Sequence, residues 1–522
     1  MAKSKVSMGK PARSPGVTVQ ELLNLERAPV PPALREVVAD DLGSEDIATE
    51  RYYAPEFYQR EVERMWSKVW QMACREEEIP QVGDHIIYEI ANTSLIVVRT
   101  GAQEIRAYHN ACLHRGRMLR ETGGNVAQFQ CPFHGFTWRL DGTLKVVPCR
   151  WDFPHIKDAE FSLPEAKVGT WGGFVFVNLD PASMPLADYL ADLPSHFTQW
   201  DFENRYKLAH VAKVVAMNWK VGVEAFIESF HVLATHPAIM PSTADTNTQY
   251  DAQKAKPHYN RMITAMASSS PHLGDGVSEQ AIWEAVKGQV GASRMDVQLP
   301  EGITAREFAA DVMRAHMRQM TNGTDFSHAT DSEMIDAIQY YVFPNFFPWG
   351  GYGPNIIYRF RPYHNEPEQT LMEVMFLAPA PKDKPQPKPA PMHLLGPHEK
   401  WADAKELGLL GPVFDQDMSN MPLVQKGLRA SRKPGVTLAD YQESRIRHLH
   451  RTLDLYMSGE IQIPMVPMAK ENGHGGNGRG RVTKKSVPAA VRGARVNAPS
   501  SPPKTSATSP RNGQRTSSAR RT

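Results

Sequence analysis

Two short segments constrain this chain more than any other part of its sequence. They read C-L-H-R-G at Cys112–Gly116 and C-P-F-H-G-F at Cys131–Phe136, so each supplies one thiol and one imidazole. A [2Fe–2S] cluster of the Rieske type takes two Cys ligands on one iron and two His ligands on the other. The sequence therefore predicts such a cluster, with four ligands: Cys112, His114, Cys131 and His134.

A zinc site is the alternative interpretation of these four residues. Zinc binds the same side chains, but zinc fingers usually pair like ligands, as C-x2–4-C and H-x3–5-H. Here each pair is mixed, as C-x-H in the first segment and C-x2-H in the second. The mixed spacing favours the cluster, and a zinc-binding interaction module stays as the weaker hypothesis.

A second group of candidate ligands lies about a hundred residues downstream, in E-A-F-I-E-S-F-H-V-L-A-T-H from Glu224 to His236. The spacing predicts a helix over Asn218–Leu233, with Glu224, Glu228 and His231 on one face. His231 and His236 are five residues apart, which on a continuous helix separates them by about 140°. Pro237 disfavours the helical conformation at His236, so a bend there can bring the two rings together.

Two histidines and one carboxylate form the facial triad of non-haem Fe(II) oxygenases. We therefore expect His231 and His236 to bind a mononuclear iron. The alternative is a pair of ordinary core or surface histidines, and the cluster motif upstream makes that alternative weaker.

The order of predicted elements indicates an α+β chain with two folded parts. Short strand-like runs separated by turn signals predict a small antiparallel domain over residues 51–180. Strands mixed with long helices predict a larger α+β domain over residues 184–460. Residues 1–50 are predicted to form an irregular arm because prolines interrupt them.

Charge and composition indicate the nature of the C-terminal tail and the expected location of the protein. The net charge of the 522 residues is +2, but Lys470–Thr522 carries +11, which leaves −9 for the rest. This tail is predicted to be disordered and solvated, and nucleic acid is not an expected partner. No apolar run is long enough for a membrane span, and no secretory signal is evident. Four cysteines do not make a disulfide framework, so we expect a cytoplasmic protein.

Together the two motifs resemble the catalytic alpha subunits of the Rieske-type non-haem iron aromatic-ring-hydroxylating oxygenases, over most of residues 45–455. The resemblance implies that the third iron ligand is an Asp in F-D-Q-D-M-S-N-M at Phe414–Met421, namely Asp417, with Asp415 as the alternative. It also implies that Glu228, where the family has Asp, bridges the iron to the cluster of a neighbouring subunit.

The resemblance further implies a Rieske β domain, a helix-grip catalytic domain and a head-to-tail homotrimer, with or without a small beta subunit. The implied activity is that of a terminal oxygenase in aromatic hydrocarbon catabolism, which hydroxylates or dihydroxylates a substrate with O2. Its electrons come from NAD(P)H through a separate reductase, a ferredoxin, or both. The alternative is a Rieske electron-transfer protein with a non-catalytic ligand-binding domain.

Aromatic residues near the second motif predict an apolar substrate pocket. The residues expected to line it are Phe226, Phe230, Phe343, Phe346 and Phe347. Such a pocket favours an aromatic, polycyclic or terpenoid substrate over a sugar or a nucleotide.

Overall fold

The computed structural model describes residues 16–292, 297–353 and 355–462 of the chain. The predicted basic tail, residues 470–522, lies outside the described residues, as do the first fifteen residues of the predicted arm. Within the described part, no helix combines the length and apolar character needed to cross a membrane.

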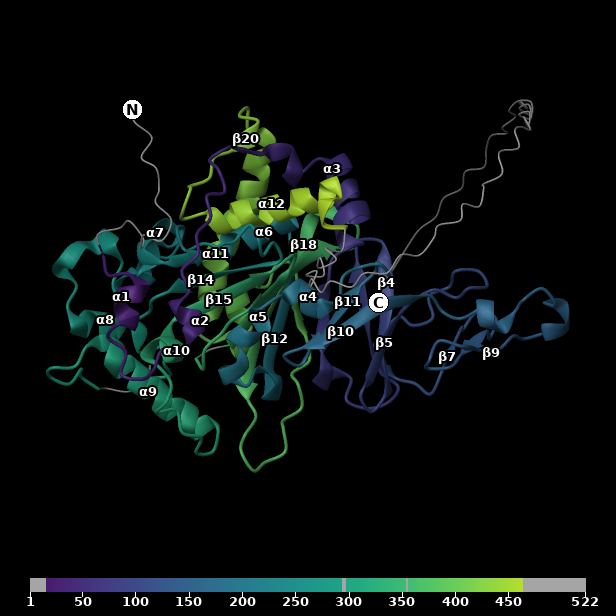
Figure 1. Cartoon of the computed structure of the whole chain (residues 1–522), viewed down its shortest axis with the longest axis horizontal. Helices are drawn as coiled ribbons and strands as arrows, with labels where there is room; N and C mark the ends of the chain where they lie inside the picture. The colour runs from purple at the N-terminus through teal and green to yellow at the C-terminus, as the bar shows by residue number, and fades with distance from the viewer. Residues whose placement is uncertain (1–15, 293–296, 354, 463–522) are drawn as a thin grey trace, which may run out of the picture. The chain divides into compact units, whose positions relative to one another are not determined.

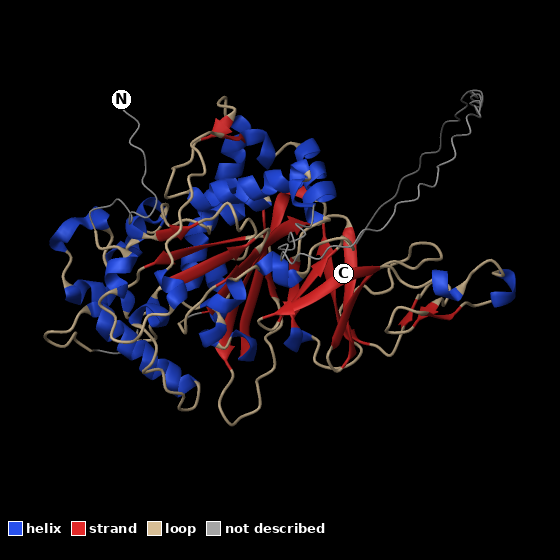
Figure 2. Cartoon of the chain, in the orientation of Figure 1, coloured by secondary structure: helices blue, strands red, loops and turns tan. Residues whose placement is uncertain are grey.

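Residues 71–178 form a seven-stranded antiparallel sheet, in the order β2-β11-β10-β5-β4-β3-β6 (Figures 1 and 2). Its strands are β2 (Gln71–Arg75), β3 (Asp84–Ile90), β4 (Thr93–Gly101), β5 (Glu104–His109), β6 (Gly124–Asn125), β10 (Glu165–Trp171) and β11 (Phe174–Asn178). A three-stranded sheet, β7 (Phe129–Gln130), β8 (Thr137–Trp138) and β9 (Leu144–Val146), carries the second Cys/His segment between β7 and β8. This small sheet lies at one end of the folded chain (Figure 1).

Residues 205–395 contain an eight-stranded sheet, in the order β13-β14-β15-β16-β17-β18-β12-β19. Its strands are β12 (Arg205–Val215), β13 (Gln249–Asp251), β14 (Tyr259–Thr264), β15 (Ala337–Val342), β16 (Phe346–Pro348), β17 (Asn355–Tyr363), β18 (Glu366–Pro379) and β19 (His393–Leu395). Adjacent strands are antiparallel except β12 and β19. This arrangement agrees with the predicted α+β class.

Helices gather around this larger sheet (Figure 2). The long ones are α9 (Ala305–Met320), α11 (Leu410–Ala430) and α12 (Ser444–Ser458), and shorter ones are α3 (Pro55–Glu61), α4 (Leu186–Leu190), α5 (Leu193–His196), α6 (Trp219–Ala225), α7 (Val232–Thr235) and α8 (Glu279–Val286). The strands β1 (Ile47–Ala48) and β20 (Gly435–Val436) pair the N-terminal arm with the segment before α12.

The prediction of one helix over Asn218–Leu233 was wrong. The structure has α6, a break, and then the single turn of α7. At the break the Ser229 N–H is bonded to the Tyr250 hydroxyl (3.0 Å), and the His231 N–H donates to the Glu228 carboxylate (3.0 Å). These side chains take the place of the helical carbonyl partners, so the helix stops and restarts.

The two sheets pack against each other through aromatic and arginine side chains. The Phe346 ring lies 4.9 Å from the Phe174 ring between centroids. Arg359 donates to the backbone carbonyls of Met72 (2.9 Å) and Ala73 (2.7 Å), while its guanidinium pairs with Glu373. The buried arginine thus ties β17 of the eight-stranded sheet to β2, the edge strand of the seven-stranded sheet.

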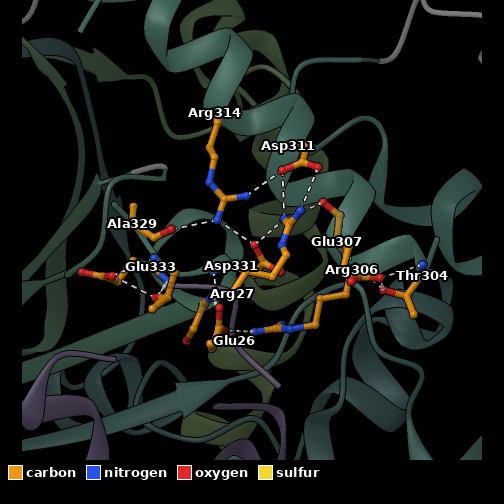
Figure 3. Close-up of polar contacts among 12 residues, drawn as sticks. Glu26, Arg27, Thr304, Arg306, Glu307, Asp311, Arg314, Ala329, Asp331 and Glu333 are labelled. Atoms are coloured by element: carbon orange, nitrogen blue, oxygen red, sulfur yellow. Dashed lines mark hydrogen bonds and ion pairs between the residues drawn. The ribbon is translucent and has the colours of Figure 1, made fainter. Parts of the chain in front are cut away.

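The N-terminal arm is held to α9 and α10 (Asp331–Ile335) by a network of charged groups (Figure 3). Glu26 accepts the N–H groups of Asp331 (2.5 Å) and Ser332 (2.9 Å), which otherwise lack partners at the start of α10. Arg27 pairs with Asp311 (2.9 Å) and Asp331 (2.8 Å). Although predicted as irregular, the described part of the arm is therefore anchored.

Candidate functional site

The two Cys/His segments fold as loops with matching backbone hydrogen bonds. The Gly116 N–H donates to the Cys112 carbonyl (2.8 Å), and the Gly135 N–H donates to the Cys131 carbonyl (3.0 Å). Both glycines have a left-handed φ, +79° and +77°, which non-glycine residues rarely adopt. Each loop therefore turns back directly after its histidine.

The four candidate cluster ligands divide into buried thiols and accessible imidazoles. Cys112 and Cys131 are buried, whereas His134 is exposed and lies beside His114, with 4.7 Å between ring centroids. Burial raises the pKa of the Cys112 thiol, and the neighbouring Cys131 thiol raises it further. Thiols so placed need a positive partner to ionise, which a metal centre supplies.

The spread of these donors fits a cluster better than a single zinc ion. Tetrahedral zinc with bonds of 2.0–2.3 Å brings its ligand atoms within about 4 Å of one another. Among the described residues, His231, His236 and Asp417 form the one set of three or more candidate ligands whose donor atoms all lie within 4.8 Å. No three of the loop donors form such a set among the described residues, which agrees with two irons that have different ligands.

The second centre is assembled from α7, its flanks and α11. The Asp417 carboxylate lies 2.9 Å from His236 Nε2 and 3.6 Å from His231 Nε2, and the rings are 5.2 Å apart between centroids. His236, at φ −126°, ends α7 immediately before Pro237. The three side chains therefore converge, with Asp417 and His236 buried and His231 partly accessible.

The outward nitrogens of both rings are occupied by neighbouring side chains. His231 Nδ1 lies 2.6 Å from the Glu228 carboxylate, and His236 Nδ1 lies 2.7 Å from the Gln416 side-chain oxygen. These acceptors place a proton on Nδ1 and leave Nε2 free to bind a metal. Burial lowers the pKa of His231, but the carboxylates of Glu228, Asp417 and Asp245 raise it more, so its pKa is raised overall.

Asp415, the alternative third ligand, has a different role in the structure. Its carboxylate accepts the N–H groups of Trp401 (2.9 Å) and Ala402 (3.1 Å), at the start of a 3-10 turn. Asp417, two residues on, lies on the buried side of α11 that faces the histidines.

The aromatic residues expected around a pocket are only partly where the sequence placed them. Phe226 is buried against Tyr358 and Phe414, with centroids 4.9 Å and 6.2 Å away. Phe230 instead is 46% exposed, and Phe346 packs against Phe174 of the seven-stranded sheet. We define Phe226, Tyr358 and Phe414 as the aromatic wall.

Phe347 and Phe343 have different surroundings. Phe347 extends the aromatic wall, 6.1 Å from Tyr358 between centroids. Phe343 stacks on Tyr456, away from this group.

Three residues of this region were not identified from the sequence. Gln416 is adjacent to Asp417, but nothing in its spacing pairs it with His236. Tyr358 is on β17, and burial and then the Asp417 charge raise its pKa, which places it near the centre. Asp245 lies nine residues after His236, and it is not part of any recognisable sequence motif.

Two family models match the chain. The Rieske [2Fe–2S] domain matches residues 69–157, and the ring hydroxylating alpha subunit (catalytic domain) matches residues 196–459. The chain therefore belongs to the ring-hydroxylating alpha-subunit family, whose members combine a Rieske [2Fe–2S] domain with a mononuclear iron domain. The two donor sets described above fit these two cofactors.

Curated relatives match over part of their length. The chain is 28% identical over 248 residues to the oxygenase subunit of glycine betaine monooxygenase from Pseudomonas aeruginosa, covering 46% of this chain and 57% of the relative. It is 33% identical over 216 residues to the large subunit of anthranilate 1,2-dioxygenase from Acinetobacter baylyi, covering 40% and 46%. The chain thus spans about half the length of these relatives.

Solved structures share the fold. A quaternary ammonium Rieske monooxygenase in complex with L-carnitine aligns with a TM-score of 0.54 at 16% identity, over 79% of this chain and 96% of that one. Naphthalene 1,2-dioxygenase from Rhodococcus bound to indole aligns with a TM-score of 0.52 at 20% identity, over 81% and 95%. The Rieske-plus-catalytic architecture is therefore the one expected from the sequence.

Proposed function

We propose that this chain is the terminal oxygenase component of a multicomponent Rieske non-haem iron oxygenase. The observation that carries the proposal is the convergence of His231, His236 and Asp417, whose ligand atoms all lie within 4.8 Å of one another. This ligand set leaves open positions on a bound Fe(II). A Rieske electron carrier with a non-catalytic domain does not need this second set of metal ligands.

The residues hold two metal centres in this proposal. Cys112, His114, Cys131 and His134 bind the cluster within a Rieske domain spanning residues 51–180, and His231, His236 and Asp417 bind the iron within a catalytic domain spanning 184–460. When bound, the cluster relays single electrons and the iron activates O2. Glu228 and Gln416 orient the two histidines through their Nδ1 protons.

The reaction also needs a partner. Inserting oxygen from O2 into a C–H or C=C bond consumes electrons and protons as well as O2, and no flavin or nicotinamide motif is evident in this sequence. A separate NAD(P)H reductase, with or without a ferredoxin, supplies the electrons. We place the system in the cytoplasm, where a reducing environment suits the cluster thiolates.

Two exposed surfaces support a head-to-tail assembly of several copies. Phe133 and Trp151 are 55% and 80% exposed near the cluster loops, and Phe230 and Leu233 are 46% and 40% exposed beside Glu228 and His231. Exposed apolar side chains of this size are typical of interfaces. When the surface at the cluster loops of one copy lies on the Phe230 and Leu233 surface of the next copy, its cluster loops reach the partner's Glu228, as in the expected homotrimer.

The substrate binds against the aromatic wall. Phe226, Tyr358 and Phe414 form a buried apolar surface, and Asp417 lies close enough to Tyr358 to affect its pKa. Such a surface fits a hydrophobic body, whether a hydrocarbon ring or a carbon chain. It also suits alkylated ammonium groups, which aromatic faces attract. Relatives of this chain are named for anthranilate as well as for choline and glycine betaine.

Metal analysis tests the proposal. Anaerobically purified protein should contain about three irons and two acid-labile sulfides per chain. Asp417→Ala should lose the mononuclear iron, leaving about two irons with the cluster spectrum unchanged, and should not hydroxylate any substrate. A wild-type protein that holds only the cluster after Fe(II) is added would support the electron-carrier alternative. Zinc without sulfide would exclude both.

A further inference from the structure

An apolar cavity of about 250 Å³ is lined by β12, β18, helix α9 and the first residue of α11. We call it the outer chamber. Its apolar side chains are Leu208, Met313, Met317, Met320, Phe376 and Leu410. The three methionines are spaced by four and three residues, so they share one face of α9. Methionine side chains are flexible and adapt to irregular apolar surfaces, which suits a binding cavity.

Helix α11 connects the outer chamber to the proposed iron centre. Leu410, its first residue, lines the chamber, and Phe414 and Asp417 follow four and seven residues later. Residues at this spacing lie on one face of a helix. That face therefore runs from the chamber past the aromatic wall, of which Phe414 is a member, to the iron ligand Asp417.

The eight-stranded sheet makes the same connection independently. In the register of β17 and β18, Tyr358 lies opposite Val374. Phe376 is two residues beyond Val374, so Tyr358 and Phe376 are diagonal neighbours on one face of the sheet, within reach of each other's rings. Tyr358 belongs to the aromatic wall, 5.9 Å from Phe414 between centroids, and Phe376 lines the chamber. The wall and the chamber are thus adjacent on both the helix and the sheet.

Among the described residues that line the outer chamber, none is acidic. Its Arg205 guanidinium donates to the backbone carbonyls of Trp200 (2.9 Å) and Gly351 (3.3 Å). Its Tyr352 hydroxyl donates to the Gln199 carbonyl (2.8 Å). Burial lowers the pKa of Arg205 to about 10, so this side chain keeps its positive charge at neutral pH. A cation in the chamber would therefore meet a like charge, which repels it.

We propose that the outer chamber binds the distal part of the substrate while the aromatic wall holds the part that is oxidised. The substrate is then an elongated molecule whose distal end is apolar and carries no positive charge. This inference rests on the proposed oxygenase function and specifies its substrate class. The apolar residues of the chamber act as specificity-determining residues, because they select the length and the charge of the bound molecule.

Three probes test length and charge. Benzyl alcohol is long enough for the aromatic wall alone, 4-hexylbenzyl alcohol adds a six-carbon chain, and the third probe carries a trimethylammonium group at the end of that chain. Binding to the anaerobic holoenzyme is measured by titration calorimetry, without O2. Each buried methylene strengthens binding about fourfold, so the hexyl probe should bind at least about a hundredfold more tightly than benzyl alcohol. The ammonium probe should bind at least about tenfold more weakly than the hexyl probe.

Two variants that fill the chamber should remove the gain from the chain. Leu208→Trp should weaken binding of the hexyl probe at least about tenfold and leave benzyl alcohol as in wild type, because the indole occupies space inside the chamber. Met317→Trp should do the same from α9, and it decides the matter if Leu208→Trp does not fold. Leu394→Trp is the matched control, since Leu394 is also a strand leucine of this sheet, is also 49% exposed and lies outside the chamber lining.

A variant of the aromatic wall tests whether one molecule occupies both places. Phe226→Leu should weaken binding of benzyl alcohol and of the hexyl probe alike. Hexyl binding that this variant leaves unchanged would show two separate sites and overturn the inference. So would equal affinity of wild type for benzyl alcohol and the hexyl probe, undiminished hexyl binding in both chamber variants, or an ammonium probe that binds as tightly as the hexyl probe. A wild-type chain without mononuclear iron would instead refute the oxygenase function, and the comparison of probes would still be readable, because no lining residue of the chamber is an iron ligand.

Discussion

At the scale of single residues, the proposed iron site depends on two side chains that are not ligands. Glu228 and Gln416 each accept a hydrogen bond from the Nδ1–H of one histidine, at 2.6 and 2.7 Å. Because an imidazole protonated at Nδ1 presents a free Nε2, these contacts orient both rings toward Asp417. Glu228 thereby has two tasks, since we also expect it to face the cluster of a neighbouring subunit.

Glu228→Gln separates these two tasks. The amide oxygen can still accept the hydrogen bond from His231 Nδ1–H, so both metal centres should remain. Turnover should fall at least about a hundredfold because the bridging charge is lost. Iron analysis and product formed per O2 consumed measure the two effects. Glu224→Gln, one turn earlier, is the control, because Glu224 bonds to Tyr52 and His450 and should not affect turnover. Near-normal turnover in Glu228→Gln would contradict the bridge assignment.

At the scale of elements, helix α11 presents two acids with different functions. Asp415 caps the turn that begins at Trp401, while Asp417 turns toward the histidines. Two residues along a helix is a rotation of about 200°, so the two carboxylates point to nearly opposite sides. The choice between them therefore depends on which side of α11 is packed against α7.

Asp415→Ala should affect stability and leave the metal untouched. Two backbone N–H groups lose their acceptor, which should lower the free energy of unfolding by about 1–3 kcal/mol. Urea unfolding measures this loss, and iron analysis should still find the mononuclear iron. An Asp415 variant that folds normally but lacks that iron would reverse the assignment of Asp415 and Asp417.

At the scale of the whole molecule, two buried histidines outside the site link stability to pH. Burial lowers the pKa of His258 to about 3 and that of His448 to about 4. His448 is held neutral, since its Nε2 donates to the Gln253 carbonyl (3.0 Å) and its Nδ1 accepts from Asn260 (3.0 Å). Both residues lie in the half of the chain built on the larger sheet.

The folded protein should lose stability as the pH falls below about 6.5, the value for a histidine in an unfolded chain. Because the folded pKa values are depressed, the unfolded state takes up the protons first, at a cost of about 2 kcal/mol per histidine between pH 7 and pH 5. Between pH 7 and pH 5, the free energy of unfolding of His448→Gln, measured with urea, should fall by about 2 kcal/mol less than that of wild type. His398→Gln, at an exposed histidine, is the control and should leave the pH dependence of the free energy of unfolding as in wild type. The same pH dependence in His448→Gln as in wild type would contradict the prediction.

The sequence by itself determined the class of the protein and most of its local motifs. Cys112, His114, Cys131 and His134 lie in two short loops, and His231 and His236 lie five residues apart, so their chemistry is encoded by neighbouring positions. Most predicted strands, such as Leu371–Ala378 within β18, also form, because runs of buried apolar residues specify them locally. Family membership was predicted from these segments alone and is confirmed by the family models.

The tertiary structure decided everything that depends on which distant segments meet. The break after α6 arises because Tyr250, on another strand, takes the Ser229 N–H. The separate placements of Asp415 and Asp417, and of Phe230 and Tyr358, follow from how α11 packs against α6 and α7 and how β17 packs against α6. Asp245 shows the same limit most clearly, because the lack of a partner for a buried charge becomes visible only when all of its neighbours are in place.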